Sequence, residues 1–274
     1  MAELDTSWGR LLNRPRGQVV AQSSAPLPDK QSVLIRLPGE RARVDIHGQR
    51  ALVFPLSTTP LSVNLVKQSV RVLDDLGFQG WIETIALADQ EVHGFRSAGF
   101  QVRQSLCLLT RDLRGTPRRS KHANQTGMTL SPVSGVRNPD IITKILRVDA
   151  CAFGQETSLD LMGFQHSLTA TKQVRVCGAW HGDELQGFAI SGRVGRGAYL
   201  QRLAVTPAGQ GQGTGSLLCH DALSWAKRQR AHRMVVNTHY ENYRALDLYA
   251  RLGFERASTG LTVMGYHRSI STTP

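Results

Sequence analysis

The segment Leu200–Ser216 reads LQRLAVTPAGQGQGTGS, and the interpretation of the whole chain starts from it. Apolar and β-prone residues run from Tyr199 to Val205 and predict a strand, which Thr206-Pro207 ends. An apolar helical pattern begins after Ser216. Between the two lie four glycines at alternate positions, namely Gly209, Gly211, Gly213 and Gly215. The predicted local order is strand, glycine-rich turn, helix.

This order of elements suits the binding of phosphate groups. The first N–H groups of a helix have no partner within the helix and lie at its positive end. Glycine has no Cβ atom, so a ligand can approach the backbone closely. The segment lacks the lysine of a P-loop and the Gly-x-Gly-x-x-Gly of a dinucleotide fingerprint. A flexible linker is the alternative, but the flanking strand and helix patterns disfavour it.

Two motifs in this region point to one family. Gln210, Gly213 and Gly215 form Gln-x-x-Gly-x-Gly after Val205-x-Pro207, which resembles the acetyl-CoA pyrophosphate loop of GCN5-related N-acetyltransferases (GNAT). The segment from Asn242 to Phe254 contains Asn-x-x-Ala-x-x-x-Tyr followed by Leu-Gly-Phe, as in the same family. The resemblance covers about residues 126–268. It implies an α/β (α+β) GNAT fold, with a mixed, mostly antiparallel twisted sheet flanked by helices.

The resemblance also implies an activity and a set of ligand-binding residues. The activity is direct transfer of acetyl from acetyl-CoA to a primary amine, carried by a small molecule, a peptide or a protein. Residues that would bind acetyl-CoA are Leu203, Ala204, Val205, Gln210, Gly211, Gln212, Gly213, Thr214, Gly215, Ser216, Asn242, Ala245 and Tyr249. The alternatives are a non-catalytic acyl-CoA-binding sensor and a nucleic-acid-associated basic protein.

Acetyl transfer needs a proton donor for the leaving thiolate and a base for the amine. Tyr249 is the candidate acid, because a phenol can donate a hydrogen bond to sulfur. The predicted central strand contains no carboxylate, so His239, Glu241 or a solvent-relayed base would accept the amine proton. Candidate acceptor contacts, which could equally be core residues, are Phe153, Leu161, Phe164 and His166.

Residues 31–113 repeat the order of the second half: strand, turn, helix, strand, helix, Gly-Phe, strand. Laying Gly99-Phe100 on Gly253-Phe254 places Phe95 at Tyr249 and Ala88 at Asn242. The turn at 57–62 contains no glycine. We interpret this half as a degenerate GNAT-like domain, in the layout of tandem acetyltransferases such as mycothiol synthase. An unrelated small α/β domain is the alternative.

The remaining segments complete the predicted domain organisation. Residues 1–30 form a flexible N-terminal lead, 31–113 the degenerate domain, 114–125 a basic linker, 126–268 the catalytic GNAT domain and 269–274 a tail. The 274 residues are 41% hydrophobic and 20% charged, which is typical of one large or two small globular domains. No apolar run approaches the roughly 20 residues of a membrane span.

Cysteine usage and charge limit the partners. The four cysteines are far apart with no Cys-x-x-Cys pair, so we expect reduced thiols, no metal site and a cytoplasmic protein. Residues 1–124 contain 17 basic and 11 acidic residues, and residues 125–274 contain 16 and 10, so each part contributes +6 to the net charge of +12. This charge permits nucleic-acid binding, although a solvated surface is the favoured interpretation. The expected state is a monomer or homodimer without membrane contact.

Overall fold

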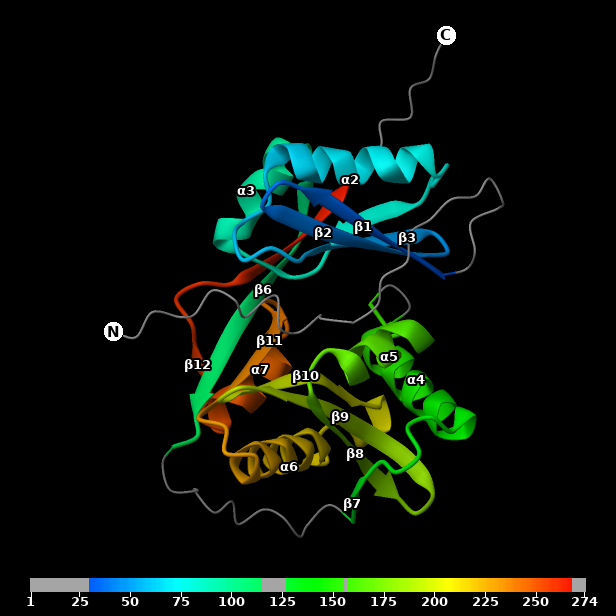
Figure 1. Cartoon of the computed structure of the whole chain (residues 1–274). Helices are drawn as coiled ribbons and strands as arrows, with labels where there is room; N and C mark the ends of the chain where they lie inside the picture. Colours follow the sequence, from blue (N-terminus) through cyan, green and yellow to red (C-terminus); the bar gives the residue numbers. More distant parts are fainter. Residues whose placement is uncertain (1–29, 115–126, 155–156, 268–274) are drawn as a thin grey trace. The chain divides into compact units, whose positions relative to one another are not determined.

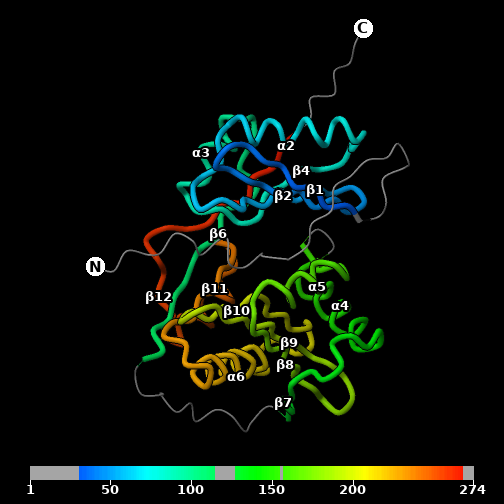
Figure 2. Tube along the Cα trace, viewed as in Figure 1, coloured from blue at the N-terminus to red at the C-terminus, as the bar shows by residue number. Residues whose placement is uncertain are grey.

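The computed structural model describes residues 30–114, 127–154 and 157–267, and the chain divides into two compact units. Unit 1 comprises residues 1–107 and 258–274, and unit 2 comprises residues 108–257. Each unit is a mixed α/β structure (Figures 1 and 2). The predicted lead, linker and tail lie outside the described residues, except for Lys30 and Arg114.

Unit 1 is a mixed sheet with two helices. Strands β1, β2 and β3 form an antiparallel meander, and β3 then pairs in parallel with β4. The order across the sheet is β1-β2-β3-β4-β13-β6, and β5 pairs with β13. The elements are β1 (Lys30–Leu37), β2 (Glu40–His47), β3 (Arg50–Pro55), α2 (Val63–Asp75), β4 (Trp81–Thr84), β5 (Leu87–Ala88), α3 (Asp89–Ser97), the first part of β6 (Gln101–Asp112) and β13 (Leu261–Tyr266).

Unit 2 has the same opening order of elements. Strands β8, β9 and β10 form an antiparallel meander, β10 pairs in parallel with β11, and α6 connects these two strands. The elements are β7 (Thr129–Pro132), α4 (Pro139–Phe153), α5 (Leu161–Thr169), β8 (Gln173–His181), β9 (Glu184–Val194), β10 (Gly197–Val205), η1 (Pro207–Gly209), α6 (Thr214–Arg228), β11 (Arg233–His239), α7 (Tyr243–Arg251) and β12 (Glu255–Arg256). This is the predicted fold class.

Helices cover both faces of the unit 2 sheet. Gly187 and Phe188 are neighbours on β9, so their side-chain positions lie on opposite faces. Phe188 packs in a core cluster with residues of α4 and α5. A Cβ atom on Gly187 would lie 3.2 Å from the Leu218 Cδ1 atom of α6 and 2.9 Å from the Ala204 carbonyl oxygen. Glycine at this position therefore lets α6 approach the sheet closely.

In each unit, one strand comes from a distant part of the chain. In unit 1, β13 lies between β4 and β6 and is antiparallel to both. In unit 2, the last residues of β6 lie between β11 and β12. The unit boundaries thus differ from the sequence-based ones, because residues 108–113 join unit 2 and the final strand joins unit 1. Strand pairing over long sequence separations decides both placements.

Helices α3 and α7 match each other residue by residue. Both have nine residues, with Ala88 and Asn242 as their N-caps. Both end in a left-handed glycine, after which the N–H of a phenylalanine bonds back to the helix: Phe100 to the Phe95 carbonyl at 3.0 Å and Phe254 to the Tyr249 carbonyl at 2.9 Å. The ring centroids of these two pairs are 5.3 Å and 5.6 Å apart. This correspondence supports the predicted repeat.

Helix α6 ends in the same way but without a glycine. Its cap uses the Ala231 N–H to the Ala226 carbonyl at 3.0 Å and the Arg230 N–H to the Lys227 carbonyl at 2.8 Å. Arg230 has φ +58°, and no other non-glycine residue of the described chain has a positive φ. A left-handed backbone costs an L-residue about 1–2 kcal/mol, so α6 ends with a strained arginine.

We expect Arg230→Gly to raise the free energy of unfolding by about 1 kcal/mol, because glycine adopts this conformation without a Cβ clash. Urea denaturation measures the difference. Arg230→Ala is the matched control, since it removes the charge but keeps the Cβ atom and should bring no such gain. A glycine variant no more stable than the alanine variant would contradict this account.

No helix of the described chain is both long and apolar enough to span a membrane.

Candidate active site

The candidate site begins where β10 separates from β11. The two strands are paired at only three positions, from Gly197 opposite Arg233 to Tyr199 opposite Val235. A register shift against β9 between Leu200 and Arg202 leaves Gln201 as a bulged residue. Beyond this bulge, β10 continues to Val205 but no longer pairs with β11. The sheet is therefore open along the last part of β10.

Backbone groups of β10 point into this opening. The Thr206 N–H donates to the Gln186 carbonyl at 2.9 Å. Near this end of β10, every second residue therefore directs its backbone N–H and carbonyl groups toward β9. Leu203 and Val205 consequently direct their N–H and carbonyl groups to the other side, toward β11. The Val205 carbonyl accepts a hydrogen bond from Gln210 Nε2 at 3.1 Å. Two of the predicted acetyl-CoA contacts thus present backbone polar groups to the opening.

The glycine-rich turn is held in place by a short hydrogen-bond network. Thr206 Oγ1 accepts from the Gly209 N–H at 3.1 Å and donates to Gln186 Oε1 at 2.7 Å. Gly211 and Gly213 both have φ +78°, a conformation that favours glycine. The turn is therefore preorganised by its own side chains and by two left-handed glycines.

Helix α6 follows this turn (Figure 1), and its N-terminus has no side-chain cap. Gly213 is the N-cap and offers no side chain to the first N–H groups of the helix. The first N–H with a partner in the helix belongs to Leu217, which donates to the Gly213 carbonyl at 3.0 Å. The preceding N–H groups, from Gly213 to Ser216, are left for an anion. Thr214 Oγ1 is also buried, without a hydrogen-bond partner in the described chain. These residues fit the phosphates of a coenzyme A moiety.

Helix α7 places Tyr249 beside α6. Asn242 Oδ1 caps the helix by accepting from the Ala245 N–H at 3.2 Å. The Tyr249 side chain is 4% exposed. Burial, together with the nearby Cys219, raises the pKa of the Tyr249 phenol well above its usual range. Tyr249 is thus protonated at neutral pH and able to donate a hydrogen bond.

Arg244 is a site residue that the sequence motifs did not indicate. It lies in the first turn of α7 and donates a hydrogen bond to Gln210 Oε1 of the glycine-rich turn. Gln210 in turn bonds to the Val205 carbonyl, so one side chain connects α7, the turn and β10. This contact places a cation beside the turn where we expect phosphate groups. Only the fold brings Arg244 to this position.

The candidate bases lie at the end of β11 and just after it. His239 is the last residue of the strand, and Glu241 follows in the turn before α7. Both side chains are exposed. The Asn242 N–H donates to the His239 carbonyl at 3.0 Å, which fixes this turn relative to α7. Both side chains are thus accessible to solvent.

The four candidate acceptor contacts have different environments. Phe164 is fully buried and packs in the unit 2 core with Ile145 and Phe188, so its prediction as a substrate contact is wrong. Phe153 and His166 are half-buried, and Leu161 is 42% exposed. The sequence left the core alternative open for all four, and the packing of α5 against the sheet decides it for Phe164.

A buried ion pair connects α4 to β10 at the bulge. Arg202 Nε and Nη2 donate to the Asp149 carboxylate at 2.7 Å and 2.6 Å, and the Asp149 side chain is fully buried. The Leu159 N–H also donates to Asp149, at 2.6 Å. The Arg202 guanidinium carbon lies 3.6 Å from the centroid of the Phe153 ring. One sequence feature indicated this pair: Asp149 lies on the apolar stripe of α4.

The equivalent positions of unit 1 are closed. All four residues of β4 pair with β3, so these strands do not separate. At the N-terminus of α2, the Ser62 N–H donates to Glu40 Oε2 at 2.9 Å, and Ser62 Oγ accepts from the Leu65 N–H. A carboxylate of the chain itself therefore sits where α6 is open. Phe95, at the position of Tyr249, has no hydroxyl group.

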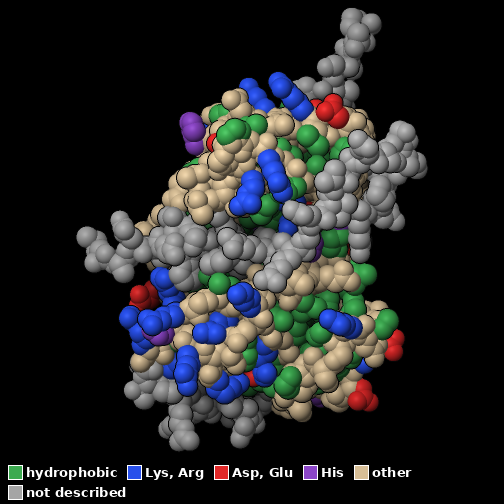
Figure 3. All heavy atoms as spheres, viewed as in Figure 1, with side chains coloured by type: hydrophobic (Ala, Val, Ile, Leu, Met, Phe, Trp, Pro, Cys, Tyr) green, Lys and Arg blue, Asp and Glu red, His purple; other side chains and the backbone are tan. Residues whose placement is uncertain are grey.

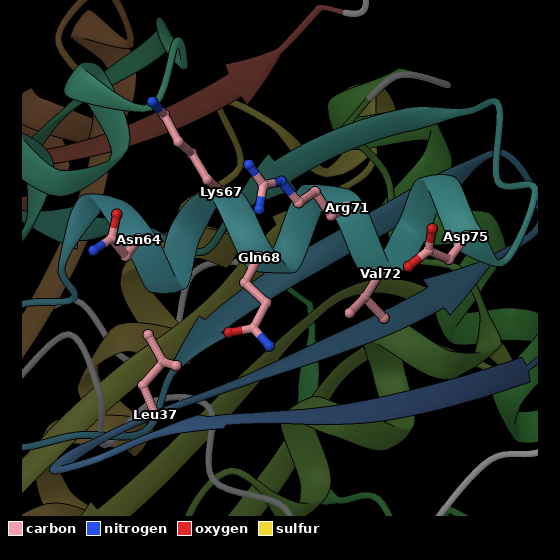
Figure 4. Close-up of a pocket in the computed structure, with 7 residues that line it drawn as sticks. All are labelled: Leu37, Asn64, Lys67, Gln68, Arg71, Val72 and Asp75. Carbon is pink, nitrogen blue, oxygen red and sulfur yellow. The ribbon is translucent and has the colours of Figure 1, made fainter.

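Neither the pocket beside α2 nor the acidic, cysteine and histidine residues of the described chain indicate a second coenzyme site or a metal site. A pocket of about 450 Å³ beside α2 is lined by solvent-facing side chains, among them Lys67 and Arg71, and by none of the predicted site residues (Figure 4). No group of three or more His, Cys, Asp or Glu residues in the described part could hold a metal ion.

Comparison with known proteins identifies the domain. Residues 142–254 match the model of the acetyltransferase (GNAT) family. No curated protein matches the chain in sequence. Among solved structures, a tandem GNAT protein from the clavulanic acid biosynthesis pathway is similar, with 13% identity, a TM-score of 0.63, and 89% of this chain and 86% of that chain covered.

Two further structures have the same fold over most of the chain. A GCN5-related N-acetyltransferase from Sphaerobacter thermophilus has 14% identity and a TM-score of 0.60, covering 88% of this chain and 82% of its own. One from Kribbella flavida has 11% identity and a TM-score of 0.54, covering 88% and 91%. Residues 142–254 thus match the GNAT family model, as the two motifs indicated, and the fold is that of GNAT proteins, consistent with a tandem arrangement.

We expect Arg202→Met to lower the free energy of unfolding by about 3 kcal/mol, because it leaves the Asp149 carboxylate buried without its cation. Urea denaturation measures this loss. The double variant Arg202→Met/Asp149→Leu should recover much of it, since no unpaired charge then remains. If the double variant loses as much free energy of unfolding as the two single variants lose together, the ion pair is not the source of the loss.

Proposed function

We propose that unit 2 transfers an acetyl group from acetyl-CoA directly to a primary amine. The observation that carries this proposal is the arrangement of three features of unit 2: β10 separates from β11, the N-terminus of α6 that follows β10 is open, and α7 holds a buried, protonated Tyr249 near Cys219 of α6. The GNAT family match supports acyl transfer in general.

Different residues would bind different parts of acetyl-CoA. The N–H groups from Gly213 to Ser216 would bind phosphate oxygens, assisted by the nearby Arg244 cation. Leu203 and Val205 would bind the pantetheine arm through backbone hydrogen bonds. Bound acetyl-CoA supplies an activated thioester carbonyl. The N–H groups of the open strand are suited to polarising that carbonyl.

Tyr249 would donate a hydrogen bond to the leaving sulfur, because its phenol stays protonated at neutral pH. For the amine proton, Asp149 is excluded, since it is fully buried and bonded to Arg202. His239 and Glu241 remain the candidates, either directly or through water. A large loss of kcat in only one of the variants His239→Ala and Glu241→Gln would identify the base.

The acceptor would bind on the α4 and α5 side of the sheet. Phe153 and His166 are half-buried there, and Arg202 stacks on Phe153. A small-molecule amine and a peptide amine both fit this proposal. Unit 1 would serve as a non-catalytic, degenerate partner, because Glu40 fills its phosphate position and Phe95 replaces the tyrosine.

We expect one molecule of acetyl-CoA to bind per chain, and Gly213→Glu to weaken binding by about 100-fold, or ~2.7 kcal/mol. The new carboxylate would lie where phosphate oxygens are expected. Isothermal titration measures both quantities. Gly213→Ala is the matched control: it brings the same backbone strain without the charge, so it should bind acetyl-CoA more tightly than the glutamate variant. Two sites per chain would contradict the assignment of unit 1.

We expect Tyr249→Phe to lower kcat by about 10²-fold while leaving the Kd for acetyl-CoA nearly unchanged. The ring packing against Phe254 survives this change, so only the hydroxyl group is lost. Acetyl-CoA-dependent acetylation of a panel of amines and peptides measures the rate. If the wild type binds acetyl-CoA but acetylates no amine, the chain acts as a sensor. If the phenylalanine variant keeps its full rate, Tyr249 is not the acid.

A further inference from the structure

Basic side chains gather at the end of unit 2 where α6 ends and β10 and β11 begin. Backbone hydrogen bonds hold these segments together: the His232 N–H donates to the Arg196 carbonyl at 2.7 Å, and the Leu113 N–H to the His232 carbonyl at 2.8 Å. We name this region the basic end. Its cationic or titratable residues are Arg114, Arg193, Arg196, Lys227, Arg228, Arg230, His232 and Arg233.

Most of the basic end is exposed, whereas Arg193, Lys227 and Arg233 are half-buried. Arg196, Arg228 and Arg230 are exposed, and the Arg114 side chain is 70% exposed. Asp112 is the acidic residue nearest along the chain, and it pairs with Arg114 at 2.5 Å. In Figure 3, lysine and arginine side chains gather on the left of unit 2, on the side where α6 ends. The region therefore has a strong local positive potential.

The backbone conformation of Arg230 is a second observation, independent of charge, about the basic end. Arg230 occupies the left-handed position that glycine fills in α2, α3 and α7. A non-glycine residue in this strained conformation points to a role for its side chain. Arg230 lies between the end of α6 and the start of β11, within the basic end, so that role would be anion binding.

The basic end is separate from the glycine-rich turn. The two lie at opposite ends of β10, whose nine residues span about 26 Å. A phosphate bound at the basic end is thus not a phosphate of the coenzyme bound at α6. An anion bound at the basic end would therefore be a separate ligand.

The chemistry of the basic end favours nucleic acid over membrane. Seven of its eight residues are arginine or lysine, and six of these are arginine, whose planar guanidinium matches phosphate oxygens. Membrane-surface segments combine cations with apolar side chains. Of the large hydrophobic residues exposed in the described chain, only Val174 lies near, on β8 beside the strand that carries Arg193.

We propose that the basic end binds the phosphate backbone of nucleic acid, without reading base sequence. The contacts are electrostatic, so the affinity falls steeply as salt is added. This proposal is independent of the acetyltransferase proposal, because it uses no residue of the glycine-rich turn or of α7. It also gives a role to the charge that sequence analysis assigned to a solvated surface.

The test is fluorescence anisotropy with a labelled 20-base-pair RNA duplex, and its DNA equivalent, between 50 and 200 mM salt. We expect micromolar binding at low salt by the wild type and by Gly213→Glu alike. The triple variant Arg196→Gln/Arg228→Gln/Arg230→Gln should bind at least 10-fold more weakly and lower the salt slope by about 2 to 3. The matched control removes three exposed arginines of unit 1, Arg36, Arg71 and Arg96, as glutamines.

Several outcomes would overturn the proposal. Absence of binding by the wild type at 50 mM salt would do so, and so would an equal loss in the control, which would show an effect of net charge alone. Tighter binding to vesicles of anionic phospholipid than to duplex would make the basic end a membrane surface. Arg230→Gly guards against a folding artefact, because it should weaken duplex binding while its melting temperature does not fall.

Discussion

The separation of β10 from β11 is the constraint on which the candidate site depends. Two parallel strands that pair at three positions and then diverge leave strand hydrogen-bonding groups without a partner in the sheet. Such groups are costly to bury unless something else bonds to them. In unit 2 that partner would be the donor substrate, and the glycine-rich turn, α6 and α7 are arranged around the same opening. In unit 1 the equivalent strands stay paired, and the site is absent.

Local signals in the sequence predicted the parts of the site that local physics controls. The strand before Thr206, the glycine turn, the cap of α7 by Asn242 and the left-handed Gly253 are each encoded within a few residues. These features place the predicted acetyl-CoA residues and Tyr249 on the expected strand, turn and helices. The helix itself begins at Thr214, slightly earlier than the apolar pattern suggested, because Gly213 serves as the N-cap.

Features that depend on distant contacts were beyond sequence analysis. Asp149 and Arg202 are 53 residues apart, and Arg244 and Gln210 are 34 apart. Phe164 illustrates the same limit, since a helical aromatic residue can face either the core or a ligand, and only the packing of α5 decides. The placement of the last strand in unit 1 was missed for this reason too. A short run of β-prone residues predicts a strand but does not indicate which strand it pairs with.

The position of β13 has a consequence for how the protein forms during synthesis. The Met264 N–H bonds to Thr84 Oγ1, a contact between residues 180 positions apart, and Met264 is fully buried in the core of unit 1. Unit 1 is translated first, yet its sheet lacks an interior strand until the ribosome has made nearly the whole chain. During that interval β4 and β6 each present an unpaired edge, which is open to incorrect pairing. Most of unit 1 thus leaves the ribosome before unit 2, but its sheet is completed only after unit 2 has been made.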